Sequence, residues 1–559
     1  MLNGTRIGRC SFRANRESRH PTLRRGFRCA AAPANRLQMQ EPPKPATQDA
    51  VFELLGNPAT YRLPATAKIV RHQTHAAIVF LGGDRALKVK RAVRYPFLDF
   101  SSLEKRKAAC EAELAINRKF APQLYRRIVP ITRESSGALA LDGSGALALD
   151  GSGEPVEWAV EMVRFDEERT LDRLAQRGEL DERLLAKFAI AVAAMHERAE
   201  PVEPTPWIAA LQQFIRNNTT LFRQHPRLFP EAAVVDLEHQ SLVAFQRLRP
   251  LLIERGQQGL IRRGHGDLHL GNIAVLDGEP VAFDALEFDP LIASGDLLYD
   301  LAFLLMDLLE FERQAAANQV LNGYYAAARR AADCDGIAAL PFFMSLRAAI
   351  RAMTTASRLD VTKDTTARSA RRYFDLALTL LPPAKPSVVG IGGLSGTGKT
   401  ALARSLAPTL APAPGALVFR SDLERKAFYG TAEHERLPVA AYRAEVSEQV
   451  YRIIIDKAAR VARAGHAVIV DAVFARAEER AALETAVAAA GVEFHGLFLV
   501  ADLATRVQRV SARTGDASDA DAEVARKQEE FVTGPITWSR VDAAGSPAQT
   551  HANARAAIK

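Results

Sequence analysis

The sequence predicts an α+β two-lobed domain followed by an α/β domain with a parallel sheet. A proline-rich segment at 381–386 separates a mostly helical stretch of the 559-residue chain from alternating strands and helices. Directly after that segment, a glycine-rich loop joins a β-branched strand to a helix. Near the start, short strands precede the helical stretch, which is the order of a small sheet followed by a helical lobe. We therefore expect a disordered basic tail at 1–48, domains at 49–380 and 387–559, and a linker at 381–386.

The composition fits a soluble protein of two or three domains, with 48% hydrophobic and 25% charged residues. The net charge of +8 arises in the first 50 residues, which hold ten basic and three acidic groups. The rest of the chain is nearly neutral, which argues against a nucleic-acid partner. The most apolar run, Leu297–Leu309, contains Asp300 and Asp307, so we expect no membrane span.

Two segments are expected to lie outside the folded domains. The tail at 1–48 is rich in arginine and poor in acids, as in an organelle transit peptide. Only composition supports that interpretation, so we favour an upstream extension with Met39 as the natural first residue. One copy of GALALDGS predicts a hairpin strand that ends in an Asp-Gly turn, and the tandem copy at Gly137–Ser152 predicts a duplication within a surface loop. Four scattered cysteines without paired spacing indicate neither a disulfide framework nor a zinc site, which fits a cytoplasmic location.

The first domain is expected to open with a hairpin. Apolar runs at Ala77–Leu81 and Ala86–Lys90 flank the turn Gly82-Gly83-Asp84, which is a hairpin signal. The elements expected after it are a helix at 102–120, a strand at 158–164 and helices at 171–199 and 297–380. A small sheet and a helical lobe follow from this order.

The segment Gly264–Ile273 has the chemistry of a phosphotransfer loop. Asp267 is followed five residues later by Asn272, which is the spacing of the kinase loop H-R-D-x-x-x-x-N. Asp267 is expected to orient and deprotonate the acceptor hydroxyl. Asn272 is expected to offer its side-chain carbonyl oxygen to Mg²⁺.

A predicted hairpin brings a second metal ligand to this loop. Runs at 273–276 and 280–284 flank the turn Asp277-Gly278. Counting back from the turn places Asn272 beside Asp284. Two hard oxygen ligands then converge, as Mg²⁺ requires, and Asp284 takes the position of the aspartate in the kinase D-F-G motif.

These motifs resemble those of the aminoglycoside phosphotransferase family, over about 51–380. The family motif H-G-D-x-x-x-x-N is matched by His265, Gly266, Asp267 and Asn272. Its later motif D-x-x-x-D-L-A is matched by Asp296, Asp300, Leu301 and Ala302. The resemblance implies the fold of eukaryotic-like kinases, with Asp296 bracing the catalytic loop. Antibiotic resistance does not follow, because the family includes choline, homoserine and sugar kinases.

The same resemblance places the nucleotide lysine on the strand after the glycine turn. Lys88 is the expected residue, and Lys90, on the same strand face, is the runner-up. The ion-pair partner is expected on the following helix, where Glu113 is preferred and Glu111 is the alternative. The sequence lacks a G-x-G-x-x-G loop and an A-P-E segment, and both absences favour a small-molecule acceptor over a protein substrate.

The second domain opens with a phosphate-binding loop. The run GLSGTGKT at Gly393–Thr400 matches G-x-x-x-x-G-K-[ST] between a strand at 388–392 and a helix at 399–406. Lys399 is expected to reach the β and γ oxygens of ATP, and the hydroxyl of Thr400 to bind Mg²⁺. The residues expected to bind the nucleotide are Gly393, Ser395, Gly396, Thr397, Gly398, Lys399 and Thr400.

Acidic residues that end or follow strands complete this expected site. Asp471 ends the strand at 467–471 and is the expected second metal ligand. Asp422 follows the strand at 417–420, where substrates bind in open α/β sheets. Asp422 is expected to activate an acceptor hydroxyl, and Arg425 to hold an anionic group of the substrate.

Three arginines at helical spacing suggest a mobile lid over the nucleotide. The residues are Arg506, Arg509 and Arg513, and we expect Arg509 and Arg513 to contact the nucleotide. A solvated basic helix face is the alternative. Together with the loop, these residues resemble the small P-loop kinases of the gluconate kinase, adenylylsulfate kinase and polynucleotide kinase type, over about 387–542.

We interpret the chain as a bifunctional, ATP-dependent and Mg²⁺-dependent kinase acting on small-molecule hydroxyl acceptors. One alternative is a P-loop ATPase domain that regulates the first domain, and another is a kinase for polynucleotide ends. A binding module with an inactive first site is a third, but Asp267, Asn272 and Asp284 are all present. The sequence gives neither acceptor nor the oligomeric state.

Overall fold

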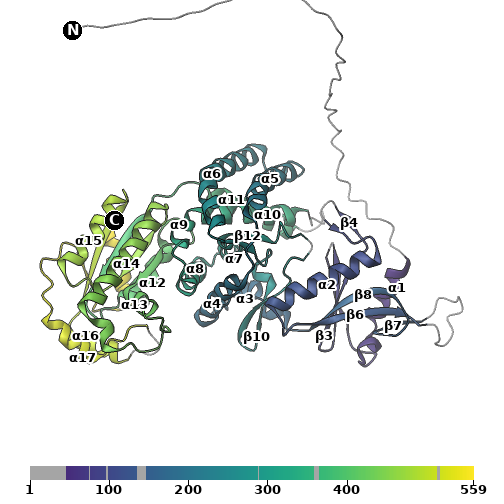
Figure 1. Cartoon of the computed structure of the whole chain (residues 1–559), viewed down its shortest axis with the longest axis horizontal. Helices are drawn as coiled ribbons and strands as arrows, with labels where there is room; N and C mark the ends of the chain where they lie inside the picture. The colour runs from purple at the N-terminus through teal and green to yellow at the C-terminus, as the bar shows by residue number, and fades with distance from the viewer. Residues whose placement is uncertain are drawn as a thin grey trace, which may run out of the picture. The chain divides into compact units, whose positions relative to one another are not determined.

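The first domain of the computed structural model begins with a six-stranded antiparallel sheet in the order β1-β2-β3-β8-β6-β7 (Figure 1). Its strands are β1 (Val70–Gln73), β2 (Ala77–Gly82), β3 (Arg85–Lys90), β6 (Tyr125–Arg133), β7 (Leu147–Leu149) and β8 (Glu154–Val163). The structure describes residues 46–74, 76–95, 98–134, 146–287, 289–357, 364–512 and 517–558. The expected tail up to residue 45, the first copy of the tandem repeat and Arg513 lie outside these residues.

The two faces of this sheet have different partners. On one face, Leu87 and Val89 are buried in a cluster with Val51 and Leu55 of helix α1 (Ala46–Gly56). On the other face, Lys88 and Lys90 contact helix α2 (Leu103–Phe120), which lies across the sheet (Figure 1). Because side chains alternate along a strand, both lysines lie on the face that α2 covers.

The second copy of the repeat forms β7, which pairs antiparallel with β6. Asp150 directly after it has a left-handed backbone, φ 59°, which aspartate tolerates in turns. This copy is therefore a sheet-edge strand that ends at an Asp-Gly turn, as the pattern of one copy predicts.

A helical lobe follows the sheet. Its helices are α3 (Leu171–Arg177), α4 (Glu182–Arg198), α5 (Pro204–Phe222), α6 (Glu231–Gln257), α7 (Leu297–Glu310), α8 (Gln314–Ala328), α9 (Asp333–Gly336), α10 (Leu340–Ala356) and α11 (Asp364–Leu380). The single helix expected at 171–199 is divided, because Gly178 ends α3 in a left-handed conformation, φ 71°. The helix pair α5 and α6 was not predicted.

The longest apolar helical run lies inside this lobe. Among the described residues, Asp333–Ala356 alone has the length and hydropathy of a membrane span, and 72% of its most apolar 18-residue window is buried. Helix α7 is buried on every side, with aspartates at 300 and 307 held by hydrogen bonds. Both runs therefore behave as core helices of the lobe.

A buried ion-pair cluster ties α6 to α9. Arg255 donates to both carboxylate oxygens of Asp296, at 2.6 and 2.8 Å, and to Asp333 at 3.1 Å. Arg255 and Asp333 are 1% exposed and Asp296 is fully buried. The cluster leaves no buried carboxylate unpaired, which is the condition under which such groups are tolerated.

We expect Arg255→Met to lower the stability of the chain by about 3–5 kcal/mol, because it leaves Asp296 buried without its cationic partner and Asp333 with Arg330 alone. Thermal unfolding measures the effect as a large fall in melting temperature. Arg249→Met, on an exposed position of the same helix, is the matched control and should change the melting temperature little. Equal melting temperatures for the two variants would contradict the structural role of the cluster.

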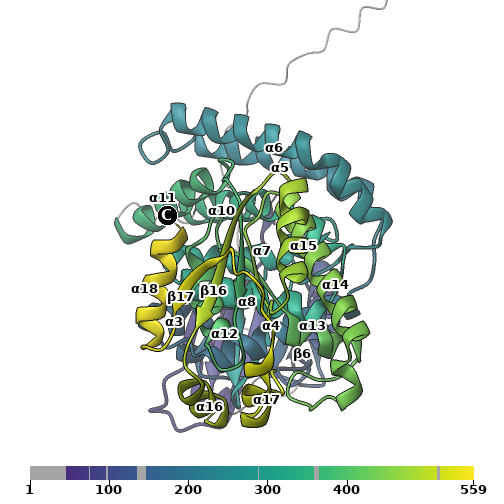
Figure 2. The ribbon, with the colours of Figure 1, turned by 90° about the vertical axis from the view of Figure 1, so that its left-hand side faces the viewer.

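The second domain contains a five-stranded parallel sheet in the order β14-β15-β13-β16-β17. Figure 2 shows its strands β16 and β17 side by side. Its strands are β13 (Ser387–Gly392), β14 (Leu417–Arg420), β15 (Val468–Asp471), β16 (Glu493–Val500) and β17 (Ser539–Asp542). Its main helices are α12 (Lys399–Leu406), α13 (Ser421–Phe428), α14 (Ala444–Arg463), α15 (Ala477–Ala489), α16 (Leu503–Ser511), α17 (Ala522–Lys527) and α18 (Pro547–Ile558). The predicted fold class is confirmed for both domains.

Helices cover both faces of this sheet. Val388 is buried in the cluster that holds Ile454 of α14, whereas its neighbour Val389 is buried in the cluster that holds Leu402 of α12 and Ala554 of α18. Successive residues of β13 thus point to opposite faces, as in a doubly wound sheet. The carboxyl ends of β13, β14 and β15 meet at one edge of the sheet, and the expected nucleotide residues follow them.

Helix α8 of the first domain covers the edge strand β14 of the second. Asn318 and Asn322 donate to the carbonyl of Ala416 at 3.0 and 3.1 Å, and Val418 N donates to Asn322 Oδ1 at 2.7 Å. Arg460 of α14 also pairs with Asp335 of α9. Because these contacts satisfy the edge of the sheet, experiments on either site are best made on the whole chain.

Candidate functional sites

The hairpin after the first catalytic loop has the predicted register. Strand β10 (Ile273–Leu276) pairs with β11 (Glu279–Ala282), with Leu276 opposite Glu279. One step further back, Phe283 N donates to the carbonyl oxygen of Asn272 at 2.9 Å. The turn geometry therefore places Asn272 near the start of the segment that carries Asp284, as the residue count from Asp277-Gly278 predicts.

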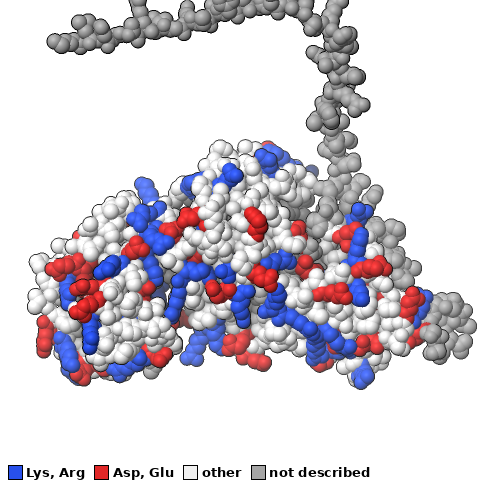
Figure 3. All heavy atoms as spheres, viewed as in Figure 1, with Lys and Arg blue, Asp and Glu red and all other residues white. Residues whose placement is uncertain are grey.

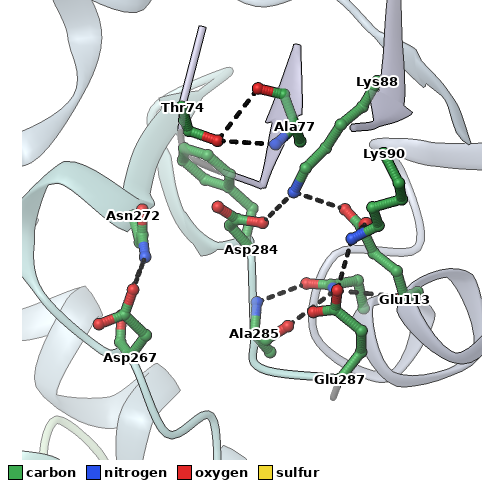
Figure 4. Close-up of polar contacts among 12 residues, drawn as sticks. Thr74, Ala77, Lys88, Lys90, Glu113, Asp267, Asn272, Asp284, Ala285 and Glu287 are labelled. Carbon is green, nitrogen blue, oxygen red and sulfur yellow. Dashed lines mark hydrogen bonds and ion pairs between the residues drawn. The ribbon is translucent and has the colours of Figure 1, made fainter. Parts of the chain in front are cut away.

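Lys88 joins the sheet lobe to this hairpin (Figure 4). Its ammonium lies 2.8 Å from Glu113 Oε1 and 2.5 Å from Asp284 Oδ1. Burial alone would lower the pKa of Lys88, but the carboxylates of Asp284 and Glu113 raise it above its ordinary value. The lysine is thus held as a cation between α2 and the metal-ligand candidate.

The alternatives to Lys88 and Glu113 lie in different surroundings. Lys90 contacts the other oxygen of Glu113 and also Glu287, so both lysines share one buried carboxylate. Glu113 is fully buried, whereas the side chain of Glu111 is 56% exposed beside Lys107. Of the two glutamates considered on α2, Glu113 is therefore the one that reaches the lysines.

Asp267 and Asn272 face each other across the loop (Figure 4). Asn272 Nδ2 donates to Asp267 Oδ2 at 3.1 Å and to the carbonyl oxygen of Asp267 at 3.0 Å. Burial alone would raise the pKa of Asp267, but His269 and then Arg351 hold it below the ordinary aspartate value. Asp267 is therefore an ionised carboxylate at neutral pH.

Asp300, and not Asp296, braces this loop. The backbone N–H groups of His265 and Gly266 donate to Asp300 at 3.0 and 3.1 Å, whereas Asp296 pairs with Arg255 and caps α7. The role that the motif implies for Asp296 is thus wrong and belongs to the second aspartate. Asp296 lies one residue before α7, so its side chain turns back to the helix N-terminus.

Two further supports of the loop were missed from the sequence. Arg347 of α10, which is 4% exposed, donates to the carbonyl oxygen of Gly266 at 3.1 Å and lies 3.8 Å from Asp300. Asp307 of α7 accepts from Leu270 N at 3.1 Å. The acids that interrupt the apolar run 297–309 were a sequence signal for Asp307. Arg347 lies in an alanine-rich helix, and its sequence context gave no such signal.

The second candidate site is a cavity of about 1310 Å³ at the carboxyl ends of the parallel strands. The phosphate-binding loop lies along it, and Gly396 has φ 86° there. A Cβ at Gly396 would lie 2.5 Å from the carbonyl oxygen of Arg506, so only glycine fits. The expected nucleotide residues that line the cavity are Ser395, Gly396, Gly398, Lys399 and Thr400.

Thr400 and Asp471 meet beside this loop. Thr400 Oγ1 donates to Asp471 Oδ2 at 2.7 Å. Strand pairing places Asp471 at the carboxyl edge of the sheet, beside the loop that follows β13, because Asp471 on β15 lies opposite Ile391 on β13 and Arg420 on β14. Arg420 approaches the same carboxylate oxygen at 3.6 Å. No group of three or more His, Cys, Asp or Glu side chains in the described part of the chain has the geometry to hold a metal ion.

The expected acceptor residues lie on α13. Asp422 and Arg425 both line the cavity, and Arg425 is 6% exposed. Its Nη1 donates to the carbonyl oxygen of Ala441 at 2.6 Å, and its guanidinium lies 5.0 Å from the ring centre of Tyr442. Within the described residues no carboxylate pairs with Arg425, and its buried Nε has no hydrogen-bond partner. An uncompensated buried cation of this kind suits an anionic ligand group.

The carboxylate of Asp519 connects helix α13, which carries the expected acceptor residues, to the segment between α16 and α17. Asp519 accepts from Tyr442 Oη at 2.6 Å, from Lys426 Nζ at 3.1 Å and from Leu437 N at 3.0 Å. Asp519 belongs to the segment between α16 and α17. None of these contacts was predicted, because they join three separate parts of the chain.

The lid arginines have different partners. Arg509 lines the cavity and donates to the carbonyl oxygens of Ala543, Ala544 and Gly545 after β17. Arg506 is 1% exposed and packs against the phosphate-binding loop instead of facing solvent. Arg513 lies outside the described residues.

Comparisons with known proteins match both halves of the chain. The profile of the phosphotransferase enzyme family matches residues 80–334, and that of an AAA domain matches residues 388–535. An uncharacterized protein of Mycobacterium bovis is 30% identical over 488 residues, which cover 85% of this chain and 92% of its own length. Uncharacterized proteins of two Mycobacterium tuberculosis strains match to the same extent.

Solved structures resemble one half of the chain at a time. A gluconokinase from Sinorhizobium meliloti is 17% identical and covers 31% of this chain and 92% of its own, with a TM-score of 0.24. A choline kinase from Cryptosporidium parvum is 9% identical and covers 60% of this chain and 95% of its own, with a TM-score of 0.35.

Proposed function

The chain belongs to the family of the mycobacterial proteins that it matches, with a phosphotransferase-family domain followed by an AAA domain, and from that membership we propose that both domains transfer a phosphoryl group from ATP. Two separate sets of phosphotransfer residues carry the proposal. The first contains Lys88, Asp267 and Asp284, and the second contains Lys399, Thr400 and Asp471. We place the protein in the cytoplasm, acting on small-molecule hydroxyl acceptors.

In the first domain, Asp267 is the proposed base. Its depressed pKa keeps it ionised, so it orients the acceptor hydroxyl and takes its proton as the phosphoryl group leaves ATP. Lys88, held by Glu113 and Asp284, is positioned to bind phosphate oxygens. Supports from Asp300 and Arg347 fix the backbone beside the base, which reduces the motion needed to reach a reactive geometry.

The oxygen donors of the first site fit Mg²⁺. The bond from Asn272 Nδ2 to Asp267 leaves the side-chain carbonyl oxygen of Asn272 available, and Asp284 supplies a carboxylate. When bound, Mg²⁺ neutralises charge on the phosphates. Asn272 and Asp284 would hold it in the first site, and Thr400 and Asp471 would hold it in the second, where a hydroxyl and a carboxylate already touch.

In the second domain, Asp422 is the proposed base and Arg425 the anchor for the acceptor. Both line the cavity that the phosphate-binding loop borders. The buried guanidinium of Arg425, which forms no ion pair with a described carboxylate, favours an acceptor with an anionic group. Arg509 is proposed to border the nucleotide, as is Arg513.

A kinase for polynucleotide ends is the weaker candidate. On the face shown in Figure 3, Lys and Arg side chains are interspersed with Asp and Glu side chains. Outside the first 50 residues the chain is also nearly neutral, which gives little net attraction to a nucleic-acid backbone. A small acceptor is therefore preferred for both sites.

The test is a metabolite screen with γ-labelled ATP on the whole chain. Lys399→Ala isolates the first site, and Asp267→Asn isolates the second. We expect each variant to label a different set of small hydroxyl compounds, and the double variant to label none. Labelling that survives in the double variant, or that responds only to an oligonucleotide, would overturn the proposal.

A further inference from the structure

One peptide unit of the phosphate-binding loop is held from the lid side. Ser395 N–H donates to Oε1 of Gln528 at 2.6 Å. Gln528 begins the short helical turn Gln528–Glu530 directly after α17, and it is 7% exposed. A backbone N–H can only donate, so this contact identifies the oxygen of the Gln528 amide.

The other end of the same peptide unit faces the loop lysine. The carbonyl oxygen of Leu394 accepts from Lys399 Nζ at 3.3 Å and from Thr397 Oγ1 at 2.8 Å. Gln528 and Lys399 therefore bind opposite ends of the Leu394–Ser395 peptide group. Because the lysine of such loops reaches the β and γ oxygens, this peptide group marks the terminal-phosphate end of the site.

The contact with Ser395 leaves the amide nitrogen of Gln528 unused. This nitrogen makes no hydrogen bond to any described residue, and Gln528 lines the cavity that Lys399 and Asp422 also line. Arg506 links the phosphate-binding loop to the residues around Gln528, because its Nη1 lies 3.5 Å from the carbonyl oxygens of both Ser395 and Ala525 and its Nη2 pairs with Glu529. Gln528 is thus a positioned donor at the edge of the phosphate site.

We propose that Gln528 recognises the γ-phosphoryl group of ATP in the second domain. Its Oε1 keeps the bond to Ser395 N, while its Nε2 donates to a γ-phosphoryl oxygen. The inference rests on the proposed nucleotide site of this domain and adds a residue that distinguishes ATP from ADP. A fixed amide donor of this kind costs no reorganisation when charge moves during transfer.

Calorimetric titration tests this on the whole chain carrying Lys88→Ala, which silences the first site. The probes are ADP and a non-hydrolysable ATP analogue, each with Mg²⁺. We expect Gln528→Leu to weaken the ATP analogue by about tenfold or more, because a bond to a charged group is lost. The affinity for ADP should change less than about twofold. Arg526→Gln, at an exposed position of α17 that does not line the cavity, is the control and should leave both affinities unchanged.

Gln528→Glu separates the two atoms of the amide. It keeps an oxygen for Ser395 N but removes the donor and adds a negative charge, so the ATP analogue should weaken more than ADP. Equal weakening of both nucleotides by Gln528→Leu would overturn the inference and assign Gln528 to loop support alone. Tighter binding of both nucleotides by Gln528→Leu would overturn the inference, because it would show that Gln528 competes with the phosphates for Ser395 N. Unchanged affinity for both nucleotides would overturn the inference as well. If the Lys88→Ala chain binds neither nucleotide, the proposed nucleotide site itself fails.

Discussion

Asp267→Asn is expected to reduce transfer by the first site by about 10²–10⁴-fold, which is the usual contribution of a positioned general base. The amide has nearly the shape of the carboxylate but cannot take the hydroxyl proton. The amide keeps an oxygen that can accept from Nδ2 of Asn272, as the carboxylate does. Binding of ATP should therefore change little, and the loss should appear in kcat for the acceptor. Measurement uses the Lys399→Ala chain, so that the second site does not contribute.

The metal-ligand variants provide the contrast for this result. Asn272→Ala and Asp284→Ala should weaken the binding of Mg·ATP, because each removes a proposed oxygen ligand. Asp284→Ala also removes a contact of Lys88, so its effect should be the larger of the two. An equal loss of ATP affinity in all three variants would contradict the separate roles of base and metal ligand.

The pH dependence gives a further check on Asp267. Its folded-state pKa lies below the ordinary aspartate value, so the carboxylate is ionised in the neutral range and loses its charge only well into the acid range. The rate of the first site should therefore show no titration of this group around neutral pH. A rate that rises through pH 6–7 and loses this step in Asp267→Asn would show that the base is protonated there, contrary to the depressed pKa.

Features set by neighbouring residues could be predicted from the sequence. The helix α12 begins and ends at the predicted residues, because the loop, its glycines and the helix start are contiguous. The register of β10 and β11 followed from Asp277-Gly278, since a two-residue turn fixes which residues face each other. Alternation along β3 likewise placed Lys88 and Lys90 on one face.

Contacts between distant segments could not be predicted. Gln528 meets Ser395 across 133 residues of sequence, and Arg347 meets Gly266 across 81. No periodicity connects such pairs, because tertiary packing alone brings them together. The exchange between Asp296 and Asp300 has a related cause: the spacing identified two acids, but the start of α7 decides which one turns toward the loop.

Lys399→Ala is expected to remove one of two nucleotide sites per chain. Titration of the wild-type chain with a non-hydrolysable ATP analogue and Mg²⁺ should give a stoichiometry near two, because each domain has its own lysine and its own pair of metal ligands. Lys399→Ala should lower the stoichiometry to one and leave the remaining affinity unchanged, and Lys88→Ala should do the reciprocal. A wild-type stoichiometry of one would refute the proposal of two kinase sites.

The alternative is that the two sites are coupled, and the contacts of α8 indicate one route for such coupling. Asn318 and Asn322 hold β14, the strand that leads to Asp422, while Tyr324 of the same helix lies 2.9 Å from His196, a neighbour of Asp300. If this helix transmitted binding, each lysine variant would also shift the other site, by equal amounts of about 1–3 kcal/mol, because linkage is reciprocal. Replacing both asparagines with alanine should then abolish the shifts while both sites still bind. Shifts that are unequal, or that survive the loss of Asn318 and Asn322, would exclude α8 as the route, and their absence from the lysine variants would establish the independence that we expect.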